Sequence, residues 1–334
     1  MTFQPATRAI RARAFFAFAF ALLLSIPGAL AQSGTAPAAE PSAADPVVIR
    51  LGSHEERASE IAWRFGVTLR GVAAQQGQAY SQEFESSLWS LLPYYLDQRV
   101  QEVALTAEAE RRGITPDMEK LESTMERIKA GLSEGQEFET VVHEAGFPDE
   151  AALRSMVTES DVINQLLEQI RTEVSATVTE PEVRVRYLAE RGRFTEAEQY
   201  CARHILVAEE AVAQEVLAQL EGGADFAELA AKYGTDATKD RGGDLGCFGL
   251  GDMIPEFQAA VVDAPIGQAV GPVASQFGYH VVLVYDHHLA RVKPFDEVKD
   301  TAREFTVAMA TQAVVDGIVQ GAGVITYPEN LPTR

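Results

Sequence analysis

The feature that most constrains the fold is a change of hydrophobic periodicity close to residue 195. From about residue 55 to residue 191, apolar residues recur at three- and four-residue spacing, as they do in amphipathic helices. Beyond that point, runs rich in β-branched and aromatic residues, such as "YCARHILV" and "GYHVVLVYD", are mixed with short helical patterns. Because no regular strand–helix–strand repeat is present, the second part predicts a compact α+β domain that follows a helical domain.

Local signals predict where several helices begin and end. Pro93 lies inside a helical pattern, so we expect it to kink or split that helix. Thr115 and Pro116 are expected to cap and open one helix. Thr179 with Glu182 predicts a capping box at the start of another.

The last part of the chain is expected to return to the helical domain. A long amphipathic pattern follows Pro294, and "GVITYP" near the end is typical of a short strand. This helix is too long to be an appendage of so small an α+β domain. We therefore expect its apolar side to pack on the N-terminal helices, which it would complete.

The N-terminal segment has the pattern of a secretory signal peptide. Arg8, Arg11 and Arg13 precede the apolar run "AFFAFAFALLLSI", and Ala29 and Ala31 occupy the small-residue positions of a cleavage site. The apolar run is short for a membrane span, which needs about 20 residues. We therefore expect cleavage after Ala31, with an uncleaved anchor as the alternative. The predicted parts are a signal peptide (1–31), a disordered linker (32–46), the helical domain (47–194), the α+β domain (195–290) and a C-terminal helix and strand (291–334).

The charge balance excludes some classes of partner. The chain has 28 Lys and Arg against 49 Asp and Glu, a formal net charge of -21. Nucleic acid and anionic membrane surfaces should repel such a chain. No helical pattern has a basic amphipathic face, so we expect no stable membrane insertion after signal cleavage. The simplest interpretation of the acidity is solubility.

The two cysteines permit at most one internal disulfide. In strand alternation Cys201 points away from the face that His204 occupies, whereas Cys247 should share a face with Leu245. We therefore expect two small buried thiols rather than a disulfide.

Two histidines lie in predicted strands and need an explanation. His204 is followed by "ILV" and His280 by "VVLV", so both are expected to be buried. A buried imidazole must find hydrogen-bond partners or cost free energy. If the two strands are neighbours, the rings can bond to one another and to a hydroxyl or carboxylate. From the spacing alone, a structural role and a role in a site remain open.

Four motifs, quoted in order, resemble those of a known family. "ARHILV", "DFAELAAKYGTDATKDRGGDLGCF", "MIPEF" and "SQFGYHVVLV" are similar to the successive motifs of the parvulin peptidyl-prolyl isomerases. The resemblance covers most of residues 199–286 and implies a small antiparallel sheet surrounded by short helices. The flanking arrangement resembles the extracytoplasmic foldase-chaperones of the SurA/PrsA group, which implies a chaperone-like helical domain.

The resemblance also implies site residues. The family's paired histidines match His204 and His280, and a position held by cysteine or aspartate matches Asp236. Neither cysteine falls at that position, and "VAEEAVAQE" lacks the basic cluster of phosphate-selective members. The expected catalytic residues are His204, Asp236, His280 and Ser275, and the expected proline pocket is formed by Leu245, Met253, Phe257 and Phe277.

The implied chemistry needs no cofactor, metal ion or nucleophile. Structural alternatives remain beside it: Met253 and Phe257 as a core pair, and Asp236 as the cap of a turn. Gly242, Gly243 and Gly246 favour a tight turn and close strand packing. His287 and His288 are adjacent in a strand and point to opposite faces, which favours a solvated strand end over a metal site.

Three hypotheses about function follow. The first is an exported peptidyl-prolyl isomerase that acts on unfolded, proline-containing exported proteins, in the periplasm or another extracytoplasmic space. The second is a peptide-binding chaperone with a catalytically inactive parvulin-like domain. The third is an assembly factor whose domain docks on a fixed partner. The presence of both histidines together with Asp236 favours the first.

Overall fold

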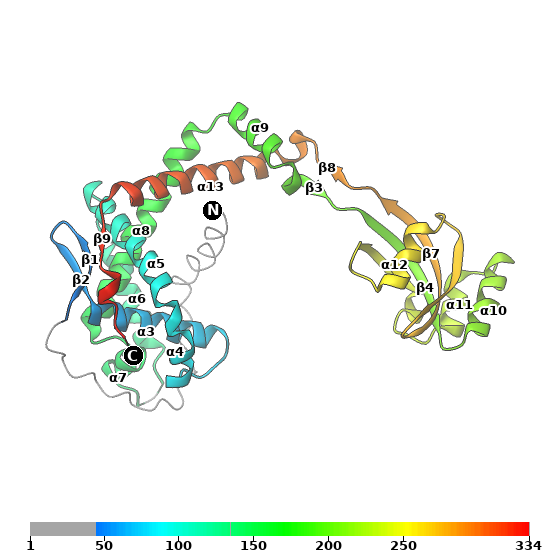
Figure 1. Cartoon of the computed structure of the whole chain (residues 1–334), viewed down its shortest axis with the longest axis horizontal. Coiled ribbons are helices and arrows are strands. Elements are labelled where there is room, and N and C mark those ends of the chain that lie inside the picture. Colours follow the sequence, from blue (N-terminus) through cyan, green and yellow to red (C-terminus); the bar gives the residue numbers. More distant parts are fainter. Residues whose placement is uncertain (1–44, 134, 334) are drawn as a thin grey trace. The chain divides into compact units, whose positions relative to one another are not determined.

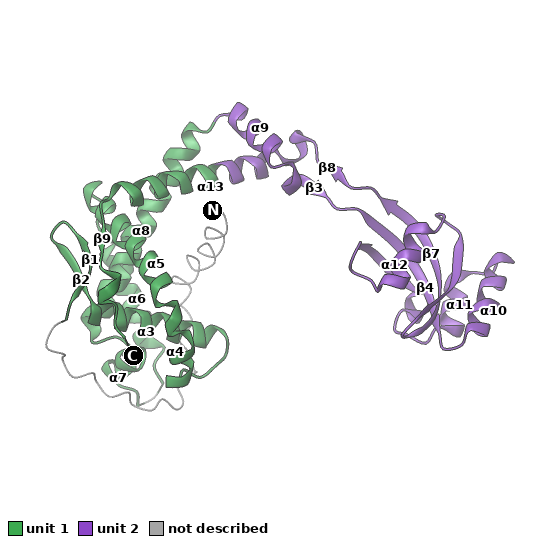
Figure 2. Ribbon diagram, viewed as in Figure 1, with its two compact units in different colours: residues 1–178, 307–334 green, residues 179–306 purple. Residues whose placement is uncertain are grey.

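The chain divides into two compact units. The structure, a computed structural model, describes residues 45–133 and 135–333, so the expected signal peptide and most of the expected linker lie outside the described residues. Unit 1 contains residues up to Val178 and from Val307 onward, and unit 2 contains Thr179–Thr306 (Figure 2). Within the described residues, no helix combines the length and the apolar character that crossing a membrane requires.

Unit 1 is helical, with one small antiparallel sheet. The sheet has the order β2-β1-β9, so the strand near the C-terminus pairs with the first strand of the unit (Figure 1). Val48 and Ile49 of β1 are fully buried. The elements are β1 (Val47–Leu51), β2 (His54–Arg57), α3 (Ala58–Gln75), α4 (Gln82–Leu88), η2 (Trp89–Leu91), α5 (Leu92–Arg111), α6 (Met118–Ala130), α7 (Phe138–Glu144), α8 (Glu150–Thr177), the second part of α13 (Phe295–Gly321), β9 (Ile325–Thr326) and η5 (Pro328–Asn330).

The second part of α13 completes a hydrophobic core of unit 1. Val315 belongs to a buried cluster with Leu105 of α5 and Leu166 of α8. Apolar residues of three segments far apart in the sequence thus share one core, which stabilises the unit through the burial of apolar surface.

Helix boundaries in unit 1 follow local chemistry. Pro93 stands in the first turn of α5. The helical pattern that surrounds Pro93 in the sequence is divided into α4, η2 and α5. The expected cap at Thr115 is wrong by two residues. Asp117 is the N-cap of α6, and its carboxylate accepts a hydrogen bond from the Lys120 N–H at 3.0 Å. A side-chain oxygen one residue before the first turn satisfies an otherwise unpaired N–H, and Asp117 holds that position.

A buried ionic network links β2 to the helices of unit 1. Arg99 is 2% exposed and Glu56 is fully buried, and Arg99 Nη2 donates to Glu56 Oε1 at 2.6 Å. Arg99 Nη2 also lies 2.5 Å from Glu159 Oε1. Burial alone would raise the pKa of Glu56, but hydrogen bonds from His54 and Arg99 outweigh it and hold the pKa at about 2. The network therefore consists of charged, paired groups.

Unit 2 is built on a four-stranded antiparallel sheet with the order β5-β4-β7-β6. One buried cluster joins Ile205 and Val281 to Phe226 of α11, and a second joins Ala202 and Val282 to Phe257 of α12. Residues that alternate along β4 and β7 therefore face two different cores. The elements are α9 (Glu180–Ala189), η3 (Arg191–Phe194), β3 (Thr195–Glu196), β4 (Gln199–Val207), α10 (Glu210–Glu221), α11 (Phe226–Tyr233), η4 (Lys239–Arg241), β5 (Asp244–Gly249), α12 (Pro255–Asp263), β6 (Ala269–Ser275), β7 (Gly278–His288) and β8 (Arg291–Val292), followed by the first part of α13.

The expected start of α9 is confirmed. Thr179 is its N-cap, and the Glu182 carboxylate accepts from the Thr179 N–H at 2.7 Å, as in a capping box. Tyr187 of α9 packs against Phe194 and Phe295, and its hydroxyl donates to the Lys293 carbonyl at 2.7 Å. These contacts tie α9 to unit 2, whereas the predicted boundary at residue 195 assigned α9 to the helical domain.

The expectation of two separate thiols is wrong. Cys201 of β4 and Cys247 of β5 are partners in the strand register, their Cα atoms are 3.9 Å apart, and they form a disulfide. The alternation argument compared each cysteine only with residues of its own strand. Residues directly opposite one another on neighbouring strands point to the same side, and this register depends on the β4–β5 pairing.

Candidate functional site

The two strand histidines meet in the middle of the sheet of unit 2. His204 of β4 lies opposite Val282 in the register, and His280 of the neighbouring strand β7 lies opposite Leu206. Their Nδ1 atoms are 3.1 Å apart, and their rings are nearly parallel at 5.3 Å between centroids. His204 is 7% exposed and His280 is 4% exposed, so the pair satisfies much of its hydrogen bonding internally.

Each end of the histidine pair is held by another polar side chain. His204 Nε2 is 3.0 Å from Asp236 Oδ2, and His280 Nε2 is 2.8 Å from Ser275 Oγ. The Thr238 hydroxyl donates to Asp236 Oδ1 at 2.9 Å, and the Phe277 N–H donates to Ser275 Oγ at 3.1 Å. The side chains of Asp236, His204, His280 and Ser275 thus form one continuous chain of hydrogen bonds, which we call the histidine network.

The charge on Asp236, at one end of the histidine network, determines which groups of the network donate hydrogen bonds and which accept them. Burial opposes ionisation of Asp236, but hydrogen bonds from Thr238 and His204 keep its pKa below the ordinary value. The carboxylate only accepts, so His204 Nε2–H donates to it. A neutral His280 then donates through Nδ1–H to His204 Nδ1 and accepts at Nε2 from the Ser275 hydroxyl.

His280 is poised to remain neutral. Burial lowers its pKa from 6.5 to about 4, and the neighbouring His204 acts in the same direction, while Asp236 opposes them. The charged form of a buried imidazole loses hydration that no nearby group replaces. Near neutral pH the network therefore presents a neutral ring at its centre and a carboxylate at one end.

An aromatic side chain lies against both histidines. The Phe257 ring stands edge to face with His204 at 5.7 Å and with His280 at 5.4 Å between centroids. Leu245 and Met253 are half-buried and pack against the same cluster as Phe257. Phe277 differs, because its ring is 62% exposed. The structure thus places Phe257 against the histidine network, puts Leu245 and Met253 on the cluster that contains Phe257, and leaves Phe277 exposed beside Ser275.

Two glycines allow the backbone to close tightly around the site. Gly243 has φ +75°, and a Cβ atom there would collide with the carbonyl oxygen of His204. Gly278 has φ +131°, and a Cβ atom there would collide with the carbonyl oxygen of Val207. Both residues therefore serve close strand packing, as expected for Gly243, and no side chain can replace them without moving β4.

One residue that supports the histidine network was not predicted from the sequence. Thr238 is 7% exposed, and its hydroxyl donates to Asp236. The spacing "DAT", in which Thr238 stands two residues after Asp236, was a usable signal, because such residues bond locally in turns. Among the described residues, one cluster has metal-ligand geometry, namely Cys201, Cys247 and His288, and the disulfide occupies its two sulfurs.

Comparison with known proteins defines the class. Residues 191–288 match the family of the PPIC-type PPIASE domain. This segment contains the complete four-stranded sheet together with α10, α11 and α12. Unit 2 is therefore built around a peptidyl-prolyl cis-trans isomerase domain of the parvulin type, as the four motifs indicated.

The similarity extends beyond this domain. The foldase protein PrsA of Caldanaerobacter subterraneus subsp. tengcongensis is 32% identical over 244 residues, which span 72% of this chain and 72% of that protein. Foldase protein PrsA 2 of Bacillus cereus is 34% identical over 190 residues, which span 57% of this chain and 59% of that protein. The chain belongs to the PrsA foldase family. A solved structure of a SurA-like chaperone from Campylobacter jejuni is 21% identical, covers 73% of this chain and 93% of its own, and has a TM-score of 0.42.

Proposed function

We propose that the chain is an exported foldase that accelerates cis–trans isomerisation of Xaa-Pro bonds in unfolded secreted or envelope proteins. The observation that carries the proposal is the histidine network lying directly against the Phe257 ring. Membership of the PrsA foldase family supports unfolded proteins as substrates. The arginine-flanked apolar segment that ends at Ala31 supports export to a periplasmic or other extracytoplasmic space.

The reaction consists of rotation about one bond, the C–N bond of the Xaa-Pro amide. Amide resonance opposes this rotation with a barrier of about 18–20 kcal/mol. A catalyst lowers the barrier by binding the twisted, less conjugated amide more tightly than the planar one. The reaction needs an oriented polar wall beside an apolar surface for the proline ring, and no covalent bond forms or breaks.

The apolar surface has a clear role in this scheme. Phe257, with Leu245 and Met253 beside it, would hold the proline ring by contact and by exclusion of water. Phe277 is exposed at the edge of the network, where its ring could cover a bound peptide. Holding the ring fixes one side of the rotating bond, so binding energy restrains the geometry of the amide.

The histidine network supplies the polar wall. Asp236 and Ser275 hold the two imidazoles from opposite ends, so the direction of each donor is set before a substrate arrives. A preorganised set of dipoles stabilises the twisted amide without reorganisation at the moment of rotation. The low pKa of His280, about 4, keeps its ring neutral and preserves the order of donors and acceptors.

The decisive experiment is a cis-to-trans isomerisation assay with the purified full chain and a short Xaa-Pro peptide. We expect catalysis in the parent chain and a loss of kcat/KM of about tenfold or more in His204→Ala and in Phe257→Leu. The matched control is His143→Ala, because His143 lies in α7 of unit 1, where its Nδ1 is 3.2 Å from the Phe147 carbonyl oxygen. Circular dichroism would verify that each variant is folded.

Two outcomes would contradict the proposal. A folded parent without catalysis would favour the peptide-binding chaperone with an inactive domain. Full catalysis in both His204→Ala and Phe257→Leu would place the active surface elsewhere. Suppression of the aggregation of several unrelated unfolded proteins would separately test the chaperone activity, and would count against an assembly factor with one fixed partner.

A further inference from the structure

The disulfide of unit 2 is strongly asymmetric in its exposure. Cys201 of the inner strand β4 is 1% exposed, whereas Cys247 of the edge strand β5 is exposed. The Cys247 side of the disulfide is therefore open to solution, and the Cys201 side is enclosed. In thiol–disulfide exchange, access decides which sulfur is attacked and which one leaves.

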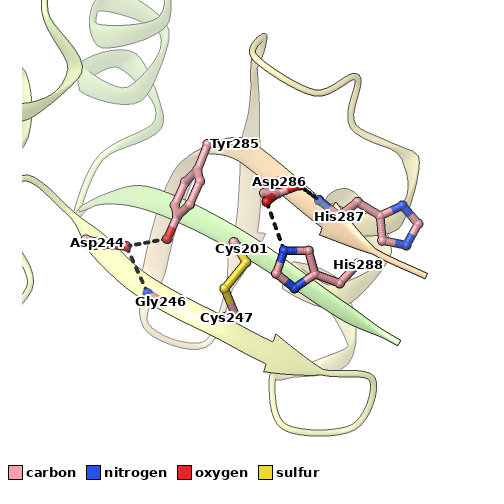
Figure 3. The surroundings of a disulfide bond; sticks show 8 residues. All are labelled: Cys201, Asp244, Gly246, Cys247, Tyr285, Asp286, His287 and His288. Atoms are coloured by element: carbon pink, nitrogen blue, oxygen red, sulfur yellow. Dashed lines mark hydrogen bonds and ion pairs between the residues drawn. A yellow bond between two sulfur atoms is a disulfide. The ribbon is translucent and has the colours of Figure 1, made fainter. Parts of the chain in front are cut away.

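A histidine lies beside this disulfide and is held by a carboxylate. One ring nitrogen of His288 lies within 4.8 Å of both sulfurs, and His288 Nε2 is 2.9 Å from Asp286 Oδ2. Figure 3 shows the His288 ring next to the disulfide, whereas the ring of His287 points away from it. His287 instead stacks on Tyr200 and lies 2.7 Å from Glu198. The two adjacent histidines thus differ in their relation to the sulfurs.

We propose that the Cys201–Cys247 disulfide is an exchange site for the thiols of unfolded polypeptides. A thiolate of the polypeptide attacks Cys247 Sγ, a mixed disulfide forms, and Cys201 leaves as a thiolate. A second thiol of the polypeptide then attacks the polypeptide's sulfur atom in the mixed disulfide and releases Cys247 as a thiolate. Two electrons pass to the cysteine pair, and the polypeptide gains a disulfide, so atoms and electrons balance.

His288 would act as a positioning and proton-carrying residue in the first step. The leaving thiolate of Cys201 forms at a buried position, where a charge is costly unless a proton or a cation compensates for it. An imidazole can deliver such a proton near neutral pH and take it back in the reverse reaction. The Asp286 carboxylate accepts a hydrogen bond from His288 Nε2 and thereby orients the ring.

The proposed exchange goes beyond isomerisation and uses other residues. Cys247 follows Leu245 by two residues on β5, but neither cysteine belongs to the histidine network or to the hydrophobic cluster around Phe257. Failure of the exchange would leave the isomerase assay unaffected, and failure of isomerisation would leave the exchange measurable. The two proposals can therefore be judged separately.

The first experiment treats the folded, oxidised full chain with N-acetylcysteine amide, an uncharged thiol that is not repelled by the acidic surface. We expect a mixed disulfide on Cys247, mapped by mass spectrometry of the proteolysed chain, while the far-ultraviolet circular dichroism spectrum stays unchanged. A disulfide that resists the thiol until the chain unfolds is structural and would overturn the proposal. So would a mixed disulfide on Cys201.

A matched pair of cysteine variants tests the asymmetry directly. In Cys201→Ser the remaining thiol is exposed, and in Cys247→Ser it is buried. We expect alkylation of the folded chain to be at least about tenfold faster in Cys201→Ser. Equal rates in the two folded variants would contradict the assignment of Cys247 as the attacked sulfur.

The adjacent histidines provide the test of His288. We expect His288→Ala to slow mixed-disulfide formation several-fold and to make its rate less dependent on pH. The control His287→Ala removes an equivalent ring that points away from the disulfide, and it should retain the parental pH profile. Identical profiles in His288→Ala and the parent would remove His288 from the proposed mechanism.

Discussion

Both units bury polar side chains deep in the protein, but the two networks differ in kind. In unit 1, Arg99 and Glu56 are charged, and each is paired with the other at 2.6 Å. In unit 2, the His280 ring has a pKa of about 4 and is neutral at neutral pH. The first network pairs a buried arginine with carboxylates, and the second is a directional chain of hydrogen bonds whose two imidazoles lie against the Phe257 ring.

The difference shows that buried polar groups can connect structural elements, as in unit 1, or form a candidate functional site, as in unit 2. A charge that is removed from water must be paired with an opposite charge nearby. The ion pairs of Arg99 therefore join α5 to β2 and α8. Neutral imidazoles need only donors and acceptors in the correct order.

The largest effect should come from breaking the ionic network of unit 1. Arg99→Met leaves Glu56 buried without its main partner, so we expect a loss of about 3–5 kcal/mol in the free energy of unfolding. Trp63 and Trp89 are the only tryptophans of the chain, and both lie in unit 1, so urea unfolding followed by tryptophan fluorescence reports on this unit.

Controls make this prediction specific. Arg111 is 71% exposed in its ion pair with Glu108, so Arg111→Met should cost much less stability than Arg99→Met. Isomerase activity, which we assign to unit 2, should survive Arg99→Met under conditions where the chain remains folded. Equal losses of stability in the two arginine variants would show that burial of the Arg99 network does not matter.

A change of pH should weaken unit 2 selectively. The pKa of His280 is about 4 in the folded chain and near 6.5 when unfolded, so the unfolded chain binds more protons between these values. Stability should consequently fall as the pH is lowered through this window, by about 2 kcal/mol between pH 7 and pH 5. Amide hydrogen exchange in β4 and β7, corrected for intrinsic rates, would measure the change.

A substitution of the same histidine sharpens this test. His280→Gln removes the titrating group, so the pH dependence of exchange in β4 and β7 should become shallower between pH 5 and pH 7. Asp236 does not obscure the result, because its lowered pKa places the loss of its contribution at more acidic pH. An unchanged slope in His280→Gln would mean that another group causes the pH dependence.

The smallest effects should come from a matched pair of helix caps. The Asp149 carboxylate accepts from the Ala152 N–H at 2.8 Å at the start of α8, and the Asp225 carboxylate accepts from the Glu228 N–H at 2.9 Å at the start of α11. Asp149→Ala and Asp225→Ala should each cost about 1 kcal/mol. We expect only Asp149→Ala to shift unfolding detected by tryptophan fluorescence. A comparable shift in Asp225→Ala would show that the two units unfold together.

The expectations that succeeded depended on local chemistry. The change of periodicity near residue 195 predicted a helical region followed by a sheet with short helices, and Glu182 predicted the cap of α9. The motifs around His204 and His280 led to the isomerase family before any distance was known. Each of these signals involves neighbouring residues, whose spacing is visible in the chain.

The expectation of two separate thiols failed because the answer depended on cross-strand register. Cys201 and Cys247 are 46 residues apart in the sequence, and only the pairing of β4 with β5 places them opposite one another. Two misses were local: Asp117 rather than Thr115 caps α6, and the Thr238 hydroxyl donates to Asp236, two residues earlier in the chain.

By itself, the sequence determined which segments form helices and strands, which histidines are buried, and which family the chain resembles. These properties follow from side-chain size, polarity and local spacing. Only the tertiary structure decided the disulfide, the order of the histidine network and the pairing of Arg99 with Glu56. Those contacts join residues distant in the chain, and their geometry depends on the packing of every element between them.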